Sequence, residues 1–215
     1  PDTWFGQSER GRMELSNRNE NSWVYEARLQ YSKSINKHYF SIMGAFEANK
    51  YWTDYTYNKS TNFEDTKQGI WGINQGLVTY APLYTYDGNQ LVSYISRATY
   101  SYNNKYVLNA SLRADGSSKL APGKRWGYFP SVSVGWRLSQ ENFLKNVEWL
   151  SELKLRGGWG QTGNQAGISS YAYLQRYKIA RQNWWGNGAN ANAMITLTPN
   201  SFSNPNLTWE TTTQS

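Results

Sequence analysis

The residues that most often carry catalysis or bind metals are scarce in this chain. It has 215 residues, one histidine (His38) and no cysteine. A single histidine builds neither a histidine triad nor a multi-histidine metal site, and without cysteine there are no disulfides or thiolate ligands. Ser151-Glu152-Leu153-Lys154 matches the S-x-x-K pattern, but it begins an expected strand and lacks the companion motifs. We therefore predict no catalytic residue, no metal site and no cofactor, and a function other than catalysis.

The composition narrows the class of protein. The chain is polar on average (mean hydropathy -0.76), yet 16% of its residues are aromatic. It has no apolar run near the ~20 residues that a membrane helix needs, whereas a transmembrane β-strand needs only about 9 to 11 residues, of which alternate ones are apolar. The net charge of +7 comes from scattered basic residues, so we expect no nucleic-acid partner.

Residues 106–136 give the clearest strand signal. From Tyr106 to Ala114 the even-numbered residues are apolar and alternate with Val, Asn, Ser and Arg. Val132, Val134 and Trp136 alternate with Ser and Gly. A period of two places each set on its own side of a sheet. Gly and Pro residues between the two runs supply a turn. We expect two strands with one face suited to lipid, joined by a loop over 116–128.

The same alternation predicts four further strands, at 23–32, 38–49, 91–102 and 153–162, with weaker signals at 10–16, 70–80 and 207–215. The gaps between strands alternate in length: 33–37 and 103–105 are short, and 50–90, 116–128 and 163–206 are long.

Alternate gaps of an up-and-down sheet lie at the same end, so one end has short turns and the other has long loops, as in outer-membrane barrels. In the remaining gap, 139–150, we expect Ser139 to cap a short helix through Leu144. Tyr and Trp gather near the strand ends, where membrane interfaces favour them. We therefore expect an all-β fold, a segment of an antiparallel up-and-down transmembrane β-barrel with long extracellular loops. The alternative is a soluble, aromatic-rich β-sandwich that binds carbohydrate, with its Leu and Val faces buried against a second sheet.

Three segments resemble the SusC/RagA type of TonB-linked outer-membrane transporter. They are 105–118 (KYVLNASLRADGSS), 125–137 (RWGYFPSVSVGWR) and 153–165 (LKLRGGWGQTGNQ). The closing segment 204–214 (NPNLTWETTTQ) is similar to the entry into the family's next barrel strand. The detailed similarity covers about residues 91–215, and the earlier part is similar mainly in its strand pattern.

The resemblance implies a plugged barrel of about 22 strands in the outer membrane of a Bacteroidetes-type bacterium. Its function would be TonB-dependent uptake of glycans or oligosaccharides, with peptides as a second substrate class. The implied partners are a SusD-like surface lipoprotein, the TonB complex and outer-membrane lipid. Residues 1–215 would be a fragment of the barrel domain, because nothing in them resembles the family's plug, TonB box or N-terminal accessory domain.

Candidates for substrate contact fall into two groups. Arg113 and Arg137 stand on polar strand faces, which would line the lumen of a barrel. The others are aromatic residues in the long segment after Gln165, whose rings could stack on sugar rings or on the lipoprotein lid: Tyr171, Tyr173, Trp184 and Trp185. The plug would cover most of the lumen wall and the loop could pack on itself, so neither group is tied to substrate by the sequence.

Overall fold

The computed structural model describes residues 9–64, 67, 69–144, 149–183 and 193–215, with the backbone alone for 179–183 and 193–196. The chain divides into two compact units, which are described separately. Unit 1 comprises residues 1–23 and 50–89, and unit 2 comprises residues 24–49 and 90–215.

Strands dominate the described part of the chain. In chain order the elements are β1 (Arg12–Ile35), β2 (His38–Thr61), η1 (Gly69–Gln75), β3 (Val78–Thr79), β4 (Leu83–Tyr102), β5 (Tyr106–Ser117), β6 (Trp126–Arg137), η2 (Leu138–Gln140), β7 (Lys154–Asn164), β8 (Arg176–Asn183), β9 (Ala193–Ser201) and β10 (Glu210–Gln214). The elements η1 and η2 are short 3₁₀ helices. No helix among the described residues has the length and apolar character needed to cross a membrane.

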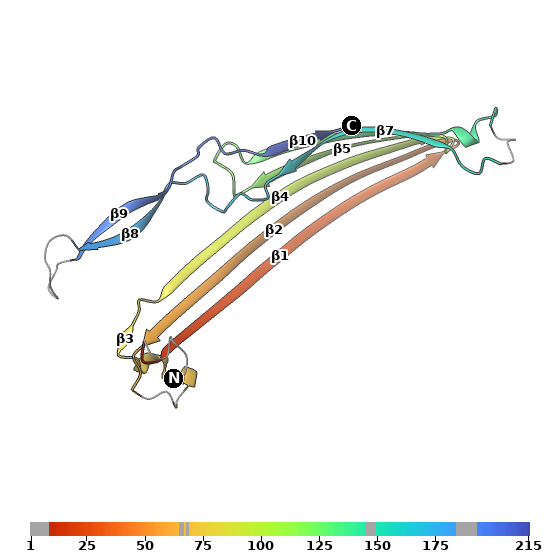
Figure 1. Cartoon of the computed structure of the whole chain (residues 1–215). Coiled ribbons are helices and arrows are strands. Elements are labelled where there is room, and N and C mark those ends of the chain that lie inside the picture. Colours follow the sequence, from red (N-terminus) through yellow and green to blue (C-terminus); the bar gives the residue numbers. More distant parts are fainter. Residues whose placement is uncertain (1–8, 65–66, 68, 145–148, 184–192) are drawn as a thin grey trace. The chain divides into compact units, whose positions relative to one another are not determined.

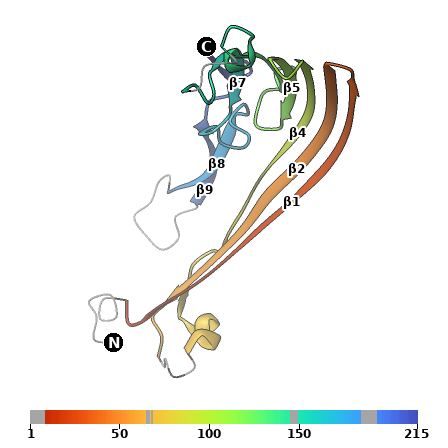
Figure 2. The same cartoon turned by 90° about the vertical axis from the view of Figure 1, so that its right-hand side faces the viewer.

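The sheet has the order β1-β2-β4-β5-β6-β7-β10, with β3 paired to β2, and β8 and β9 form a separate hairpin. Figures 1 and 2 show β4 between β2 and β5, and β1 on the other side of β2. The pairs β4–β5, β5–β6, β6–β7 and β7–β10 are all antiparallel. Neighbours in the sheet are therefore mostly neighbours in the chain, which confirms the predicted all-β, up-and-down class.

Several element boundaries differ from the sequence prediction. Strands β1 and β2 each extend over 24 residues, so β2 continues into the expected loop 50–90. Its added part is rich in Tyr, Trp and Thr, which suit strands. The weak strand expected at 70–80 is a 3₁₀ helix followed by the two residues of β3. The expected loop 163–206 contains the β8–β9 hairpin, which the prediction missed.

The short helix that we expected after Ser139 is also different. The structure has only η2 there, and Ser139 lies inside it. The residue before the helix, Arg137, makes no side-chain capping hydrogen bond. The amide of Ser139 instead donates to the carbonyl of Leu153 at 3.2 Å. This bond ties the connection to the start of β7, and that contact across the connection prevails over the local capping preference.

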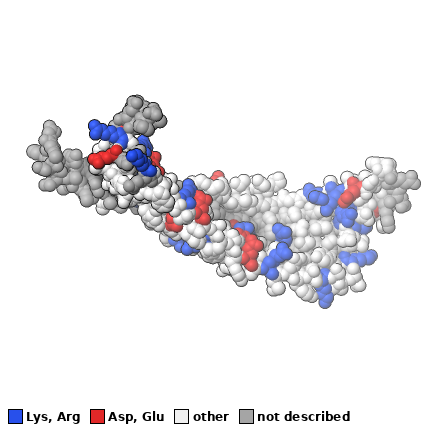
Figure 3. Space-filling view, turned by 90° about the horizontal axis from the view of Figure 1, so that it is seen from below, with Lys and Arg blue, Asp and Glu red and all other residues white. Residues whose placement is uncertain are grey.

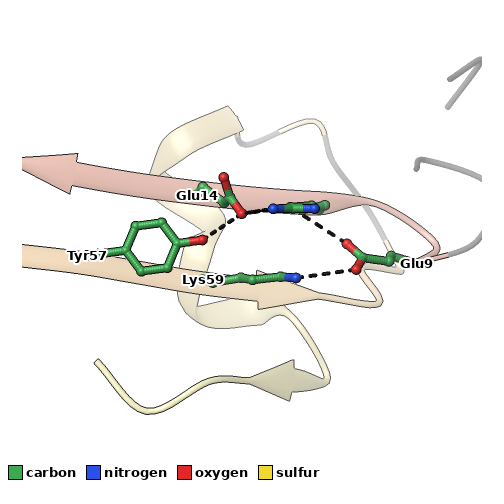
Figure 4. A network of polar contacts seen from close by, with 5 residues as sticks. Glu9, Glu14, Tyr57 and Lys59 are labelled. Carbon is green, nitrogen blue, oxygen red and sulfur yellow. Dashed lines mark hydrogen bonds and ion pairs between the residues drawn. The ribbon is translucent and has the colours of Figure 1, made fainter. Parts of the chain in front are cut away.

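In unit 1 a polar network joins the beginning of β1 to the end of β2 (Figure 4). Lys59 on β2 lies 3.3 Å from Glu9, and the Tyr57 hydroxyl donates to Glu14 at 2.6 Å. Arg12 pairs with both Glu9 and Glu14. These contacts fix the two strand ends against each other.

Unit 2 contains a small packed core near the start of β6 and the end of β7. Leu120 and Ala121 are fully buried and Phe129 is nearly so. The Phe129 ring meets Trp209 edge to face, with 5.4 Å between the ring centres. A Cβ atom added to Gly163 would lie only 2.0 Å from the Phe129 ring. Gly163 therefore leaves room for the Phe129 ring, and we call this space the socket.

We predict that Gly163→Ala destabilises the protein by about 1–3 kcal/mol, the usual cost of overpacking a filled site. The matched control is Gly157→Ala on the same strand, whose added Cβ would come no closer than 3.9 Å to Val134. Thermal unfolding of the two variants provides the measurement. Equal unfolding temperatures would contradict the socket.

Candidate functional site: the two faces of the unit 2 sheet

The register of β4 to β7 determines which side chains share a face. Tyr100 pairs with Leu108, Leu108 with Val134, and Val134 with Gly157. Directly paired residues point to the same side of a sheet. The even-numbered residues of β4, β5 and β6 therefore form one face, together with Leu155, Gly157 and Trp159 of β7, and this face is apolar, as predicted from the alternation.

The apolar face is exposed. Leu112 is 44% and Val134 56% accessible, and Leu155 on β7 is 55% accessible. Among the described residues no second sheet covers these side chains, which contradicts the β-sandwich alternative. Large apolar patches of this kind mark contact with a membrane or with another protein.

Two rows of aromatic rings cross the apolar face. The first runs through Tyr25, Phe46, Tyr94 and Trp126, with ring centres 5.3–6.2 Å apart. The second row comprises His38, Phe40, Tyr100, Tyr102, Tyr106 and Trp136, with ring centres 4.9–6.4 Å apart.

The spacing of the rows fits a bilayer. Trp126 and Trp136 begin and nearly end β6, ten residues apart, which is about 33 Å along a strand. At the tilt of about 35–45° found in membrane barrels, this length spans about 25 Å, the height of the apolar band between the aromatic girdles. The residues between the rows are mainly aliphatic, including Leu108, Leu112 and Val134.

The opposite face carries rows of polar side chains. Thr99 donates to Asn109 at 2.9 Å, and Asn109 donates to Ser133 at 3.3 Å. One row further along, the hydroxyls of Ser111 and Ser131 lie 2.7 Å apart. Each bond joins two neighbouring strands, so the polar face also holds the strands together.

Arg113 is the best-anchored candidate of the polar face. Its Nε donates to both carboxylate oxygens of Asp115, at 2.7 and 2.8 Å, and its Nη2 donates to Ser93 at 3.0 Å. Asp115 is buried. The pair lines a groove of about 980 Å³ that also includes Lys119, Gln161 and Asn164. This groove can offer charged groups and amides to a polar ligand.

The structure keeps the two predicted arginines apart. Arg113 pairs with Phe129 of β6 in the ladder. Arg137 lies eight residues beyond Phe129 on β6, which is about 26 Å along the strand. Arg137 pairs with Glu152 at 3.7 Å. Tyr171 and Tyr173 lie in the turns between β7 and β8, Tyr171 with a positive φ of 63°. Trp184 and Trp185 lie outside the described residues.

His38 is part of the second aromatic row. Its Nδ1 lies 2.9 Å from the Tyr100 hydroxyl. Among the described residues no group of His, Asp and Glu is arranged to hold a metal ion. The single histidine therefore has a packing partner, which the sequence could not identify because the two residues are 62 positions apart.

One carboxylate collects three donors at the short-turn end of unit 2. Glu141 accepts hydrogen bonds from Tyr106 at 2.7 Å, Lys105 at 3.0 Å and Trp136 at 3.1 Å. The bonds from Tyr106, then Lys105 and Trp136, lower the pKa of Glu141 to about 2 from its ordinary 4.5. The sequence analysis missed this residue because its donors come from the turn before β5, from β5 and from β6.

On the face seen in Figure 3, the charged side chains of the described residues form no single dominant patch. Lys and Arg occur there in small groups, several of them beside Asp or Glu. This distribution agrees with the scatter of basic residues along the sequence.

The chain is similar to several known proteins, although no protein-family model matches it. It is 36% identical over 199 residues to the TonB-dependent receptor SusC of Bacteroides thetaiotaomicron, an alignment that covers 88% of the chain and 18% of the receptor. It is 31% identical to the TonB-dependent receptor P26 of Formosa agariphila, which covers 95% of the chain and 20% of that protein. The chain thus spans about a fifth of the length of these relatives.

Solved structures agree in fold. The RagAB peptide transporter matches with a TM-score of 0.82 and 23% identity, over 94% of the chain and 22% of that structure's chain. The RagAB peptide importer in its closed-closed state matches with a TM-score of 0.81 and 24% identity, over 93% and 21%. These relatives are named as receptors, transporters or importers, and none is named as an enzyme.

We predict that the contacts of Glu141 persist in moderate acid. A carboxylate whose pKa falls on folding stabilises the folded state above its unfolded pKa, and this contribution disappears as the pH drops through the folded pKa. With the values above, the loss occurs between about pH 4.5 and pH 2. Hydrogen exchange of the backbone at 138–141, corrected for the intrinsic pH dependence, measures it.

Glu141→Gln should raise the exchange of this segment already at neutral pH. Glu152→Gln is the control, since the contact of Glu152 with Arg137 is long, at 3.7 Å. Equal effects of the two substitutions, or loss of protection already well above pH 4.5, would contradict the assignment.

Proposed function

Because the chain belongs to the SusC/RagA-type TonB-dependent receptors of the bacterial outer membrane, we propose that it forms part of the wall of an importer barrel. All 215 residues would belong to the barrel domain, and the plug and accessory domain would lie elsewhere in the protein. The relatives are receptors and transporters, and the chain is not an enzyme.

The exposed apolar face between the two aromatic rows carries this proposal. In water, that face would need a second layer. In a bilayer, aliphatic side chains contact lipid tails, and aromatic rings at both borders contact the headgroup regions. Leu108, Leu112, Val132 and Val134 would then face lipid.

The polar face would line the barrel interior. Arg113 and Arg137 would point toward the plug and the passing substrate, and the groove beside Asp115 would lie at the end with the long loops. That end, including the loop between β5 and β6, would lie outside the cell. The turn at 103–105 and the connection after η2 would lie in the periplasm, following the arrangement of outer-membrane barrels.

The proposed substrate class is oligosaccharides, with a SusD-like lipoprotein covering the outer end and TonB supplying energy through the plug. The oligosaccharide class is the one that the resemblance to the SusC/RagA family implies, and the chain is 36% identical to the receptor SusC. The second candidate class is peptides, because the structurally similar RagAB proteins are a peptide transporter and a peptide importer.

We predict that Leu112→Arg hinders assembly in the membrane. An arginine at the bilayer midplane on the lipid face of a barrel costs about 2–4 kcal/mol, whereas lumen positions tolerate polar residues. Ser111→Arg on the next residue is the matched control, because its side chain lies on the polar face. The fraction of intact receptor that shows heat-modifiable gel migration is the measurement. Equal losses in both variants would contradict the assignment of faces.

Uptake tests the function itself. We expect that cells lacking the intact receptor fail to import a labelled oligosaccharide that the parent imports, and that a plasmid copy of the gene restores import. The same cells are also tested with a labelled peptide mixture. Loss of peptide import alone would replace the oligosaccharide class by peptides. Unchanged import of both would overturn the transport proposal.

A further inference from the structure

Unit 1 presents an aromatic surface that the transport proposal leaves unused. Tyr84 and Tyr86 lie two residues apart on β4 and therefore point to the same side of the strand. Their side chains are 63% and 48% accessible. We name Tyr84, Tyr86, Trp52 and Asp54 the β2–β4 platform.

Contacts between the strands fix the platform. The Tyr84 hydroxyl donates to Asp54 on β2 at 3.3 Å. A Cβ atom added to Gly88 would lie 3.2 Å from the Trp52 Cβ and 3.3 Å from the Tyr86 hydroxyl. The side chain of Tyr86 thus extends along its own strand toward Gly88, where an added Cβ atom would be tightly packed. An outer surface of each tyrosine remains free.

Charged groups stand beside these rings. The Asp54 carboxylate meets Tyr84, and the Lys50 ammonium lies 5.1 Å from the centre of the Trp52 ring. The aromatic rows of unit 2, by contrast, border a band of Leu, Val and Ala. A carboxylate and an ammonium would be costly to bury in lipid, so the platform suits an aqueous ligand.

The network on the other side of β2 supports the platform. Tyr57 and Lys59 have odd numbers, so their side chains lie on the opposite face of β2 from Asp54. Tyr57 binds Glu14, and Lys59 binds Glu9 (Figure 4). Lys59 also lies 4.6 Å from the centre of the Tyr80 ring. The strand that carries Trp52 and Asp54 is therefore held by its opposite face, which leaves the platform free for a ligand.

We propose that the β2–β4 platform binds a chain of sugar rings. The C–H faces of a pyranose ring carry slight positive charge and stack on the negative face of an aromatic ring. Sugar hydroxyls donate to a carboxylate and accept from an ammonium. Two tyrosines about 7 Å apart along a strand can contact neighbouring rings, with Asp54 and Lys50 at their edge. The inference rests on the proposed function only in the source of the sugar. That source is either a soluble glycan or a glycolipid of the membrane.

Binding by the purified intact receptor tests the platform. The probes are soluble starch, xylan and mannan, and vesicles with and without lipopolysaccharide. We expect Tyr84→Ala/Tyr86→Ala to weaken binding of a sugar probe by about tenfold or more. The variant Tyr84→Phe/Tyr86→Phe, which keeps both rings, should bind within a few-fold of the parent. Trp71→Ala on η1 is the control, an 88% exposed aromatic residue outside the platform.

Loss of binding to a polysaccharide identifies a soluble glycan as the source, and loss only on lipopolysaccharide vesicles identifies a glycolipid. Either result supports the platform. The inference is overturned if no sugar probe binds, or if the double alanine variant binds sugar like the parent. It is also overturned if that variant loses no more sugar binding than Trp71→Ala, or if the main loss is in binding to vesicles without lipopolysaccharide. Oligosaccharide import by the alanine variant is measured in parallel. If import is intact but the platform binds no sugar, the proposed transport function is retained and only the platform is rejected. If the platform binds sugar but import is absent, only the transport function is rejected.

Discussion

The constraint on which the structure depends is that unit 2 is a single layer of strands without a second layer to cover it. Backbone ladders join β4 to β7, and their register assembles one apolar face from four strands. Few described apolar side chains are buried, chiefly Leu120, Ala121 and Phe129 in this unit. Stability therefore comes from the ladders and from whatever surrounds the apolar face. A bilayer satisfies that requirement, because lipid tails replace the missing layer while the closed hydrogen bonding of a barrel leaves no unpaired strand edge.

The polar face and the strand ends meet different demands. Between strands, Thr99, Asn109 and Ser133 bond to one another, and Arg113 neutralises the buried Asp115. At the short-turn end, Glu141 connects the ends of two strands to the segment after η2. Each contact fixes a position along the sheet that the ladders alone leave open. The polar groups thus give this face of the sheet a definite shape.

Much of the fold could be read from the alternation of residue types. The opposite faces of Leu112 and Arg113 follow from a period of two, and the register bears this out. Element lengths could not be read in the same way. Strand β2 runs on to Thr61 because pairing with neighbours continues where the alternation of apolar residues weakens. The β8–β9 hairpin was missed for a similar reason, since its strands are held by each other in a segment where Gly and Asn suggested a loop.

The sequence by itself determined the class of fold, the face on which each strand residue lies and the resemblance to a receptor family, because all three depend on residue types at short spacing. Only the tertiary structure decided which residues meet across the sheet. Residues from different strands or connections meet in the pairing of His38 with Tyr100, around Glu141, in the socket at Gly163 and on the β2–β4 platform. Such contacts depend on register and on the order of strands in space, and neither is encoded in any local pattern.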